Sequence, residues 1–174
     1  VDQLHYYDLY APLVGDVDAK YPIDLARKNI TSSLKPLGDD YVGVINESLD
    51  KRWIDLYPSA GKRSGAYSNG GAYDVHPYML INYNGKYDDM STLAHELGHS
   101  MHSHLTWKNQ PFVYTEYSLF VAEVASNFHQ AMLRGHLLDT VTDKNFQLAL
   151  IEEAVGGNFF RYFFQMPTLA RFEL

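Results

Sequence analysis

The stretch over residues 90–105, MSTLAHELGHSMHSHL, constrains the fold more than any other part of the chain. It contains the pattern H-E-x-x-H, made by His95, Glu96 and His99. Residues four apart on an α-helix lie on one face, about one turn from each other, so the two imidazoles can reach one point. Apolar residues recur at helical spacing through the same stretch: Met90, Leu93, Ala94, Leu97 and Met101. The pattern therefore predicts a helix that presents two histidines side by side.

Two imidazoles at this spacing suit a zinc ion, which binds nitrogen at about 2 Å. Glu96 follows the first histidine, so its carboxylate can lie beside the metal without binding it and take a proton from a water molecule there. The alternative is a histidine-rich helix that binds no metal. The helical context favours the metal site, because it is the context that the pattern requires.

A catalytic zinc ion takes three protein ligands and keeps one position open. The extended pattern H-E-x-x-H-x-x-G-x-x-H is absent, since His102 and Leu105 occupy its last two fixed positions. A second helix is predicted over residues 114–138, with Glu116 and Glu123 roughly on one face. Glu123 is flanked by apolar residues, where a carboxylate is costly unless it is paired or bound to metal. We expect Glu123 to be the third ligand and Glu116, near the helix start, to support the site or face solvent.

The remaining polar candidates are weaker. His102 lies seven residues past His95, about 10 Å along the helix axis, so we expect it to pack behind the ligands. Residues 75–83 are rich in strand formers and precede a turn at Asn84-Gly85, which predicts a short strand with a possible hairpin partner. An extended substrate could pair with such a strand, with His76 and Tyr78 beside it. The alternative is a purely structural sheet in which His76 is a packing residue.

Other segments predict architecture. Residues 21–36 and 37–56 carry apolar stripes at helical spacing, with Trp53 expected in the core. The glycine-rich residues 58–73 predict a mobile loop, either a lid or a plain connector. Residues 145–155 predict a helix that Gly156-Gly157 interrupts or kinks, and the aromatic residues 159–164 predict core.

Composition excludes several classes of function. The 174 residues suit one domain, and the net charge of −7 argues against nucleic acid or an anionic membrane as partner. The apolar runs are too short to span a bilayer. The absence of cysteine favours a reducing compartment, and we expect a cytoplasmic protein.

These motifs resemble the thimet oligopeptidase and oligoendopeptidase F family of zinc metallopeptidases. The resemblance rests on HELGH at residues 95–99 with His102 following, and on RSGAY at 63–67, HPYMLINY at 76–83, FVAEVAS at 120–126, FR at 160–161 and FE at 172–173. It implies one zinc ion held by His95, His99 and Glu123, with Glu96 as general base. It also implies cleavage of short peptides in a deep channel between helical walls.

The resemblance also implies a part of a larger fold, because members of the family are several times longer. We therefore expect residues 1–174 to form one partial metallopeptidase domain, mainly α, with a zincin-like helical core and a small β-hairpin or short sheet before the motif helix. The aromatic residues within 1–14 could pack against an absent domain or a second chain. Two rival hypotheses are a zinc-binding fragment without turnover and a structural helical interaction domain.

Overall fold

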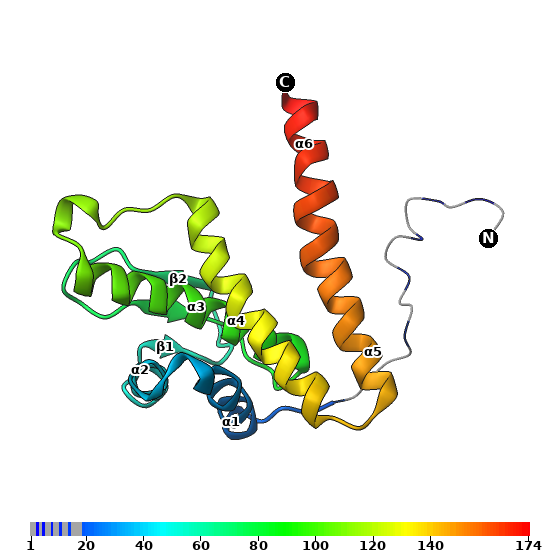
Figure 1. The fold of residues 1–174 in the computed structure, drawn as a ribbon, viewed down its shortest axis with the longest axis horizontal. Helices are drawn as coiled ribbons and strands as arrows, with labels where there is room; N and C mark the ends of the chain where they lie inside the picture. The colour runs from blue at the N-terminus through cyan, green and yellow to red at the C-terminus, as the bar shows by residue number, and fades with distance from the viewer. Residues whose placement is uncertain (1–2, 4, 6–7, 9–10, 12–13, 15–18) are drawn as a thin grey trace. The chain divides into compact units, whose positions relative to one another are not determined.

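A computed structural model describes residues 3, 5, 8, 11, 14 and 19–174, so most of the aromatic segment near the start lies outside the described residues. The chain divides into two compact units, Ala19–Asp139 and Val1–Asp18 with Thr140–Leu174. Helices dominate, and three short strands form one sheet (Figure 1). The mainly α prediction with a short sheet is confirmed. None of the helices in the described part of the chain combines the length and hydropathy needed to cross a bilayer.

The first two helices are α1 (Ile23–Leu34) and α2 (Asp39–Asp50), joined by the 3₁₀ turn η2 (Lys35–Leu37). The predicted apolar stripes face inward: Ala26, Ile30 and Leu34 of α1 and Ile45 of α2 are buried. Gly38 starts α2 with a φ of 99°, a conformation that glycine adopts without strain. The stripe on α2 continues past the helix end to Trp53, which is buried as predicted.

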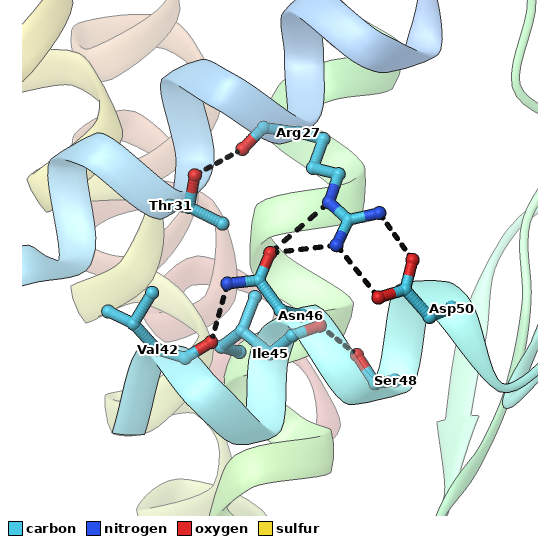
Figure 2. A network of polar contacts seen from close by, with 7 residues as sticks. All are labelled: Arg27, Thr31, Val42, Ile45, Asn46, Ser48 and Asp50. Atoms are coloured by element: carbon cyan, nitrogen blue, oxygen red, sulfur yellow. Dashed lines mark hydrogen bonds and ion pairs between the residues drawn. The ribbon is translucent and has the colours of Figure 1, made fainter. Parts of the chain in front are cut away.

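A polar network ties α1 to α2 (Figure 2). The Arg27 guanidinium donates to Oδ1 of Asn46 at 3.2 and 3.0 Å and to both carboxylate oxygens of Asp50 at 2.5 and 3.0 Å. Asn46 in turn donates to the Val42 carbonyl at 3.1 Å. The hydrogen bond from Arg27 lowers the pKa of the Asp50 carboxyl. Because the guanidinium is a rigid fork, these contacts fix how the two helices cross.

The sheet has the order β1-β3-β2, from strands Ile54–Asp55, Tyr67–Asn69 and Tyr78–Leu80. β3 pairs in parallel with β1 (Ile54 with Met79) and antiparallel with β2 (Ser68 with Met79). The short strand and the short sheet before the motif helix are as predicted; the antiparallel partner of β3 is β2, which precedes it, and the turn at Asn84-Gly85 leads into the motif helix. β3 is the central strand, and β2 forms one edge of the sheet.

The glycine-rich segment is held by several hydrogen bonds, and its role as a mobile lid stays a prediction. Its residues 67–69 form β2. The Lys62 side chain is only 4% exposed and donates to the carbonyls of Asp55, Tyr57 and Ile81 at 2.7–2.9 Å. Asn82 donates to the carbonyl of Gly65 at 2.9 Å. Composition cannot reveal these long-range anchors, because glycine and serine are typical of both mobile loops and tight turns.

The motif helix is α3 (Tyr87–Asn109), and its predicted apolar face is buried. Asp89 caps its start by accepting hydrogen bonds from the backbone of Asn84 and Lys86, both at 2.9 Å. After the 3₁₀ turn η3 (Phe112–Tyr114), α4 runs over Leu119–Thr140. The predicted start of this helix at residue 114 is wrong. Glu116 consequently lies in the connecting segment, and it does not share a helix face with Glu123.

The C-terminal unit contains α5 (Lys144–Glu153), the π-helical segments η4 (Ala154–Phe159) and η5 (Arg161–Gln165), and α6 (Met166–Glu173). These elements run on as one helix in Figure 1, so the predicted interruption at Gly156-Gly157 is wrong. The predicted aromatic core is also wrong: Phe159, Phe160, Phe163 and Phe164 are exposed, Phe163 by 68%. Aromatic residues distributed around a single helix cannot all be buried unless other elements surround it.

One buried contact joins α2 to α4. His129 of α4 is 1% exposed, and its Nε2 lies 2.6 Å from the hydroxyl of Tyr41 on α2. Burial lowers the pKa of His129 to about 4. The imidazole is therefore neutral in the folded protein over the whole physiological range.

We predict an acid-dependent loss of stability from this histidine. Above about pH 6.5 His129 is neutral in both states, and between about 6.5 and 4 only the unfolded state binds the proton. The free energy of unfolding should therefore fall on acidification by about 1.4 kcal/mol per pH unit, about 3 kcal/mol in total. His129→Gln should remove this contribution. Urea unfolding with a chelator present, from pH 7.5 to 4, measures it, and parallel pH profiles for the two proteins would contradict the prediction.

Candidate metal centre

Three side chains from two helices converge at the motif. α3 supplies His95 and His99, and α4 supplies Glu123. One nitrogen or oxygen atom of each lies within 4.8 Å of the others, and all three residues are half-buried. The two Nε2 atoms are 3.2 Å apart, Nε2 of His95 is 3.4 Å from Glu123 Oε2, and Nε2 of His99 is 3.8 Å from Glu123 Oε1. The structure thus brings together the three ligands that the sequence predicted.

The hydrogen bonds that the His95 and His99 rings form on the side away from the cluster determine which ring nitrogen carries a lone pair. Nδ1 of His95 lies 2.9 Å from Oε1 of Gln130, whose amide nitrogen donates to Ser91 at 3.0 Å. The oxygen of Gln130 can only accept, so Nδ1 of His95 donates and Nε2 carries the lone pair. His99 is hydrogen-bonded to the Ala122 backbone, a contact that raises its pKa and so has the ring as donor.

Both Nε2 atoms therefore present lone pairs to each other at 3.2 Å. Burial, and then the neighbouring His95, lowers the pKa of His99, which keeps its ring neutral and able to bind metal. In a tetrahedral zinc site with bonds of about 2.0–2.1 Å, adjacent ligand atoms are about 3.3 Å apart. The separations of 3.2 and 3.4 Å match this value. The donor set therefore fits a metal ion of this kind.

Gly98 allows α4 to approach. A Cβ atom at Gly98 would lie 2.6 Å from the carbonyl oxygen of Ala125 and 2.7 Å from Cα of Ser126. These are backbone atoms of α4, which cannot move aside as a flexible side chain can. The backbones of the two helices thus cross in direct contact at the motif, and Glu123 lies less than one turn from the crossing. Ser126 also donates to Glu123 Oε2 at 3.0 Å and orients the carboxylate.

Glu96 lies beside the cluster in a different environment. It is 7% exposed, and its Oε2 has no hydrogen-bond partner among the described residues. Burial, together with the negative charge of Glu123, raises the pKa of Glu96 to about 7, and a backbone hydrogen bond from Ser68 of β2 opposes this shift. A carboxyl group poised near neutral pH can both accept and release a proton.

Two further predicted residues lie outside the cluster. The His102 ring stacks on Tyr117, with ring centroids 4.0 Å apart, which agrees with a packing position beyond the ligands. Glu116 is exposed in the segment before α4, next to Tyr117. It approaches neither histidine of the cluster closely enough to form an ion pair, as Glu123 does.

His76 and Tyr78 belong to an aromatic stack. The His76 ring lies parallel to Trp53 at 4.6 Å and tilted against Tyr78 at 4.5 Å. Trp53 also approaches His104, which is half-buried. Trp53, His76 and His104 line a cavity that includes none of the three candidate ligands, and Tyr78 is not among its lining residues. Their predicted contact with a substrate stays a prediction.

Sequence reasoning missed three residues that shape the site: Gln130, Ser68 and Gly98. Gln130 follows Glu123 by seven residues, so it lies on the same helix face, and this spacing could have found it. Ser68 contacts Glu96 through its backbone, and any residue type could make this contact, so the sequence does not reveal it. Gly98 is one of the two variable positions of H-E-x-x-H, and the pattern alone cannot tell which of them meets another helix.

Comparison with known proteins places the chain in a family. Its sequence matches Peptidase family M3 over residues 21–174. The chain belongs to peptidase family M3. It is 42% identical to oligopeptidase PepF of Bacillus subtilis over 173 residues, and 40% identical to an oligoendopeptidase F homologue of Borreliella burgdorferi over 174 residues. The predicted resemblance to oligoendopeptidase F is thus confirmed.

The same likeness extends to three dimensions. A peptidase crystal structure from Chlamydophila abortus superposes with a TM-score of 0.87 at 38% identity, over 99% of this chain and 29% of that one. The sequence matches cover 99% of this chain but only 26% of PepF and 29% of the Borreliella protein. The chain therefore spans between a quarter and a third of the length of these relatives.

We predict that Gly98→Ala disrupts the site through the helix crossing. The added methyl group meets backbone on α4, so α4 must move away and take Glu123 with it. The free energy of unfolding should fall by about 1–3 kcal/mol, and metal affinity should fall as well. Gly135→Ala on α4 is the matched control, because its Cβ position has no atom within 4 Å apart from its chain neighbours and the backbone of its own helix.

The control should leave metal binding intact and change stability by at most about 1 kcal/mol, in the stabilising direction. Denaturant unfolding and metal titration of both variants are the measurements. Equal behaviour of the two variants would show that the crossing at Gly98 does not determine the site.

Proposed function

We propose that the protein is a zinc-dependent metalloendopeptidase that hydrolyses peptide bonds in short peptides. In this proposal His95, His99 and Glu123 hold one zinc ion and Glu96 is the general base. The observation that carries it is the convergence of two imidazole lone pairs and a carboxylate within 4.8 Å, beside a separate buried carboxyl group. Membership of peptidase family M3 supports the same reaction.

A bound zinc ion would lower the pKa of a water molecule towards about 7 and polarise a carbonyl group. Glu96 takes the proton from the water that attacks the peptide carbonyl. It then passes this proton to the nitrogen of the departing amine, so the same carboxyl group serves as base and acid. Burial raises the pKa of Glu96 to about 7 in the absence of metal, and a bound cation would lower it, which favours the carboxylate form that accepts the proton.

The edge strand β2 is the best candidate for holding the substrate backbone. We had assigned this role to residues 75–83, but β3 is paired on both sides and has no free edge. Among the described strands β2 pairs with β3 alone, and its residue Ser68 reaches Glu96 through its backbone. A peptide added antiparallel to β2 would be held by main-chain hydrogen bonds, which suits a peptidase that accepts many sequences.

The assignment of roles is tested by two substitutions that differ in what they remove. Glu96→Gln should keep close to one zinc ion per chain and lower peptide hydrolysis by about 10²–10⁴-fold, because the proton acceptor is lost while the ligands stay. Glu123→Gln should lose zinc itself, because a neutral amide is a poorer ligand than a carboxylate. Glu47→Gln, a half-buried acid on α2 that is paired with Lys51, is the control for charge removal.

Metal content of each purified variant and cleavage of a quenched short peptide give the two readings. Zinc in the parent without chelator-sensitive cleavage would reject the peptidase activity but keep the metal site. Cleavage by Glu96→Gln at the parent rate would reject the role of Glu96. A parent protein that takes up no zinc after reloading would reject the proposal as a whole.

A further inference from the structure

A second cavity opens at the end of β2, apart from the candidate metal ligands. It has a volume of about 300 Å³ and lies between three segments of the Ala19–Asp139 unit. These are the end of β2 at Asn69 and Gly70, the face of α3 at Ser103 and Trp107, and the segment before α4 at Glu116 and Tyr117. Polar groups supply most of its lining, so a polar or charged ligand suits it better than an apolar one.

The cavity adjoins the site proposed above. Ser103 follows His99 by four residues, so it lies on the same face of α3, one turn or about 6 Å further along the axis. On the strand side the cavity begins at Asn69, the residue after Ser68, whose backbone is hydrogen-bonded to Glu96. An extended peptide advances about 3.3 Å per residue, so a peptide bound at Glu96 reaches this cavity with its second or third residue.

The wall of the cavity is held by close contacts. A Cβ atom at Gly70 would lie 2.6 Å from Oγ of Ser103 and 2.9 Å from the Trp107 ring, so this strand end packs directly on α3. Oγ of Ser103 is hydrogen-bonded to the Tyr117 hydroxyl at 2.5 Å. The Tyr117 ring stacks on His102. Strand, helix and connecting segment are thus linked into one rigid wall around the open space.

Glu116 gives the cavity its charge. Of the described residues that line it, Glu116 alone is charged. No ion pair within the described part of the chain involves this carboxylate. An anionic group that lines a polar cavity and forms no ion pair with the described residues is complementary to a cation.

We infer that this cavity is a subsite for a positively charged group of the peptide substrate, with Glu116 as its specificity-determining residue. The group is either a lysine or arginine side chain or the free α-amino end. An antiparallel peptide runs towards its own N-terminus as β2 runs towards Gly71, so the charged group lies two or three residues before the cleaved bond. This inference rests on the proposed peptidase function and names its substrate preference.

The test compares cleavage of peptides that differ at one position. Quenched peptides carry Lys, Gln or Glu at the second or third residue before the cleaved bond, each with a free or an acetylated N-terminus. For the parent we expect kcat/KM to be about 5–10-fold higher with Lys than with Glu. Glu116→Gln should abolish most of this ratio, and Glu116→Lys should reverse it. Glu47→Gln, the same change on α2, should keep the parental ratio.

The two N-terminal forms separate the sources of the charge. A ratio that survives acetylation indicates a side-chain subsite, while a preference that exists only for free N-termini indicates recognition of the α-amino group. A ratio near one in the parent, or an equal change in Glu116→Gln and Glu47→Gln, would overturn the inference.

Binding provides a reading that does not depend on turnover. The affinities of the Glu96→Gln protein for the Lys and Glu peptides, with and without Glu116→Gln, should show the same ratio by fluorescence anisotropy. A preference for Lys that disappears with Glu116→Gln would support the subsite even if no peptide were cleaved, whereas cleavage without any charge preference would reject the subsite and keep the peptidase.

Discussion

The contact between the backbones of α3 and α4 at Gly98 is the constraint on which the candidate site depends. Two histidines four residues apart require only one helix, but a third ligand has to come from another element. Side chains normally hold helix axes 8–10 Å apart, and a glycine at the crossing lets them come closer. Here the carbonyl of Ala125 occupies the space that a side chain at position 98 would need. At this crossing Glu123 of α4 faces both imidazoles, while His129, on a different face of α4, is buried. The same packing therefore forms both the site and the core beneath it.

The electrostatics of the cluster favour a cation at its centre. Two nitrogen lone pairs face each other at 3.2 Å, the Glu123 carboxylate faces both, and the Glu96 carboxyl is buried beside them with one oxygen unpartnered among the described residues. Each of these features is unfavourable alone, because repulsion and desolvation are strongest where water is excluded. A single cation at the centre relieves the first two directly and draws the pKa of Glu96 down. The hydrogen bond that His95 donates to Gln130 and the one that Ser126 donates to Glu123 hold the ligands in place without supplying any positive charge.

Sequence could predict the residues of the site whose positions follow from helix geometry or from the free-energy cost of burying one charged side chain. The i, i+4 histidines follow from helix periodicity, and Glu123 follows from the cost of a carboxylate among apolar neighbours. Glu116 was misplaced because α4 begins five residues later than its apolar pattern suggested, and helix ends are the least certain feature of such patterns. The strand order was out of reach for a different reason: β1 and β2 pair with β3 across intervening segments. The exposed aromatic residues of the C-terminal unit show the same limit, since hydrophobicity predicts burial only when a second surface is present.

β2 illustrates how a segment with little secondary-structure propensity can organise a site. Asn69 and the glycines that flank β2 are poor strand formers, yet the small residues Ser68 and Gly70 are what allow this segment to lie against α3. Ser68 reaches Glu96 through its backbone and Ser100 through its hydroxyl, at 2.8 Å, while Gly70 meets Ser103 two residues later. The chain therefore contacts α3 on both sides of Asn69, the residue at which the proposed substrate subsite begins. In a peptidase built this way, main-chain hydrogen bonds along β2 would supply affinity that does not depend on the substrate sequence. Discrimination between substrates would then have to come from side chains beyond the end of the strand. Glu116 is the charged side chain that the fold places there.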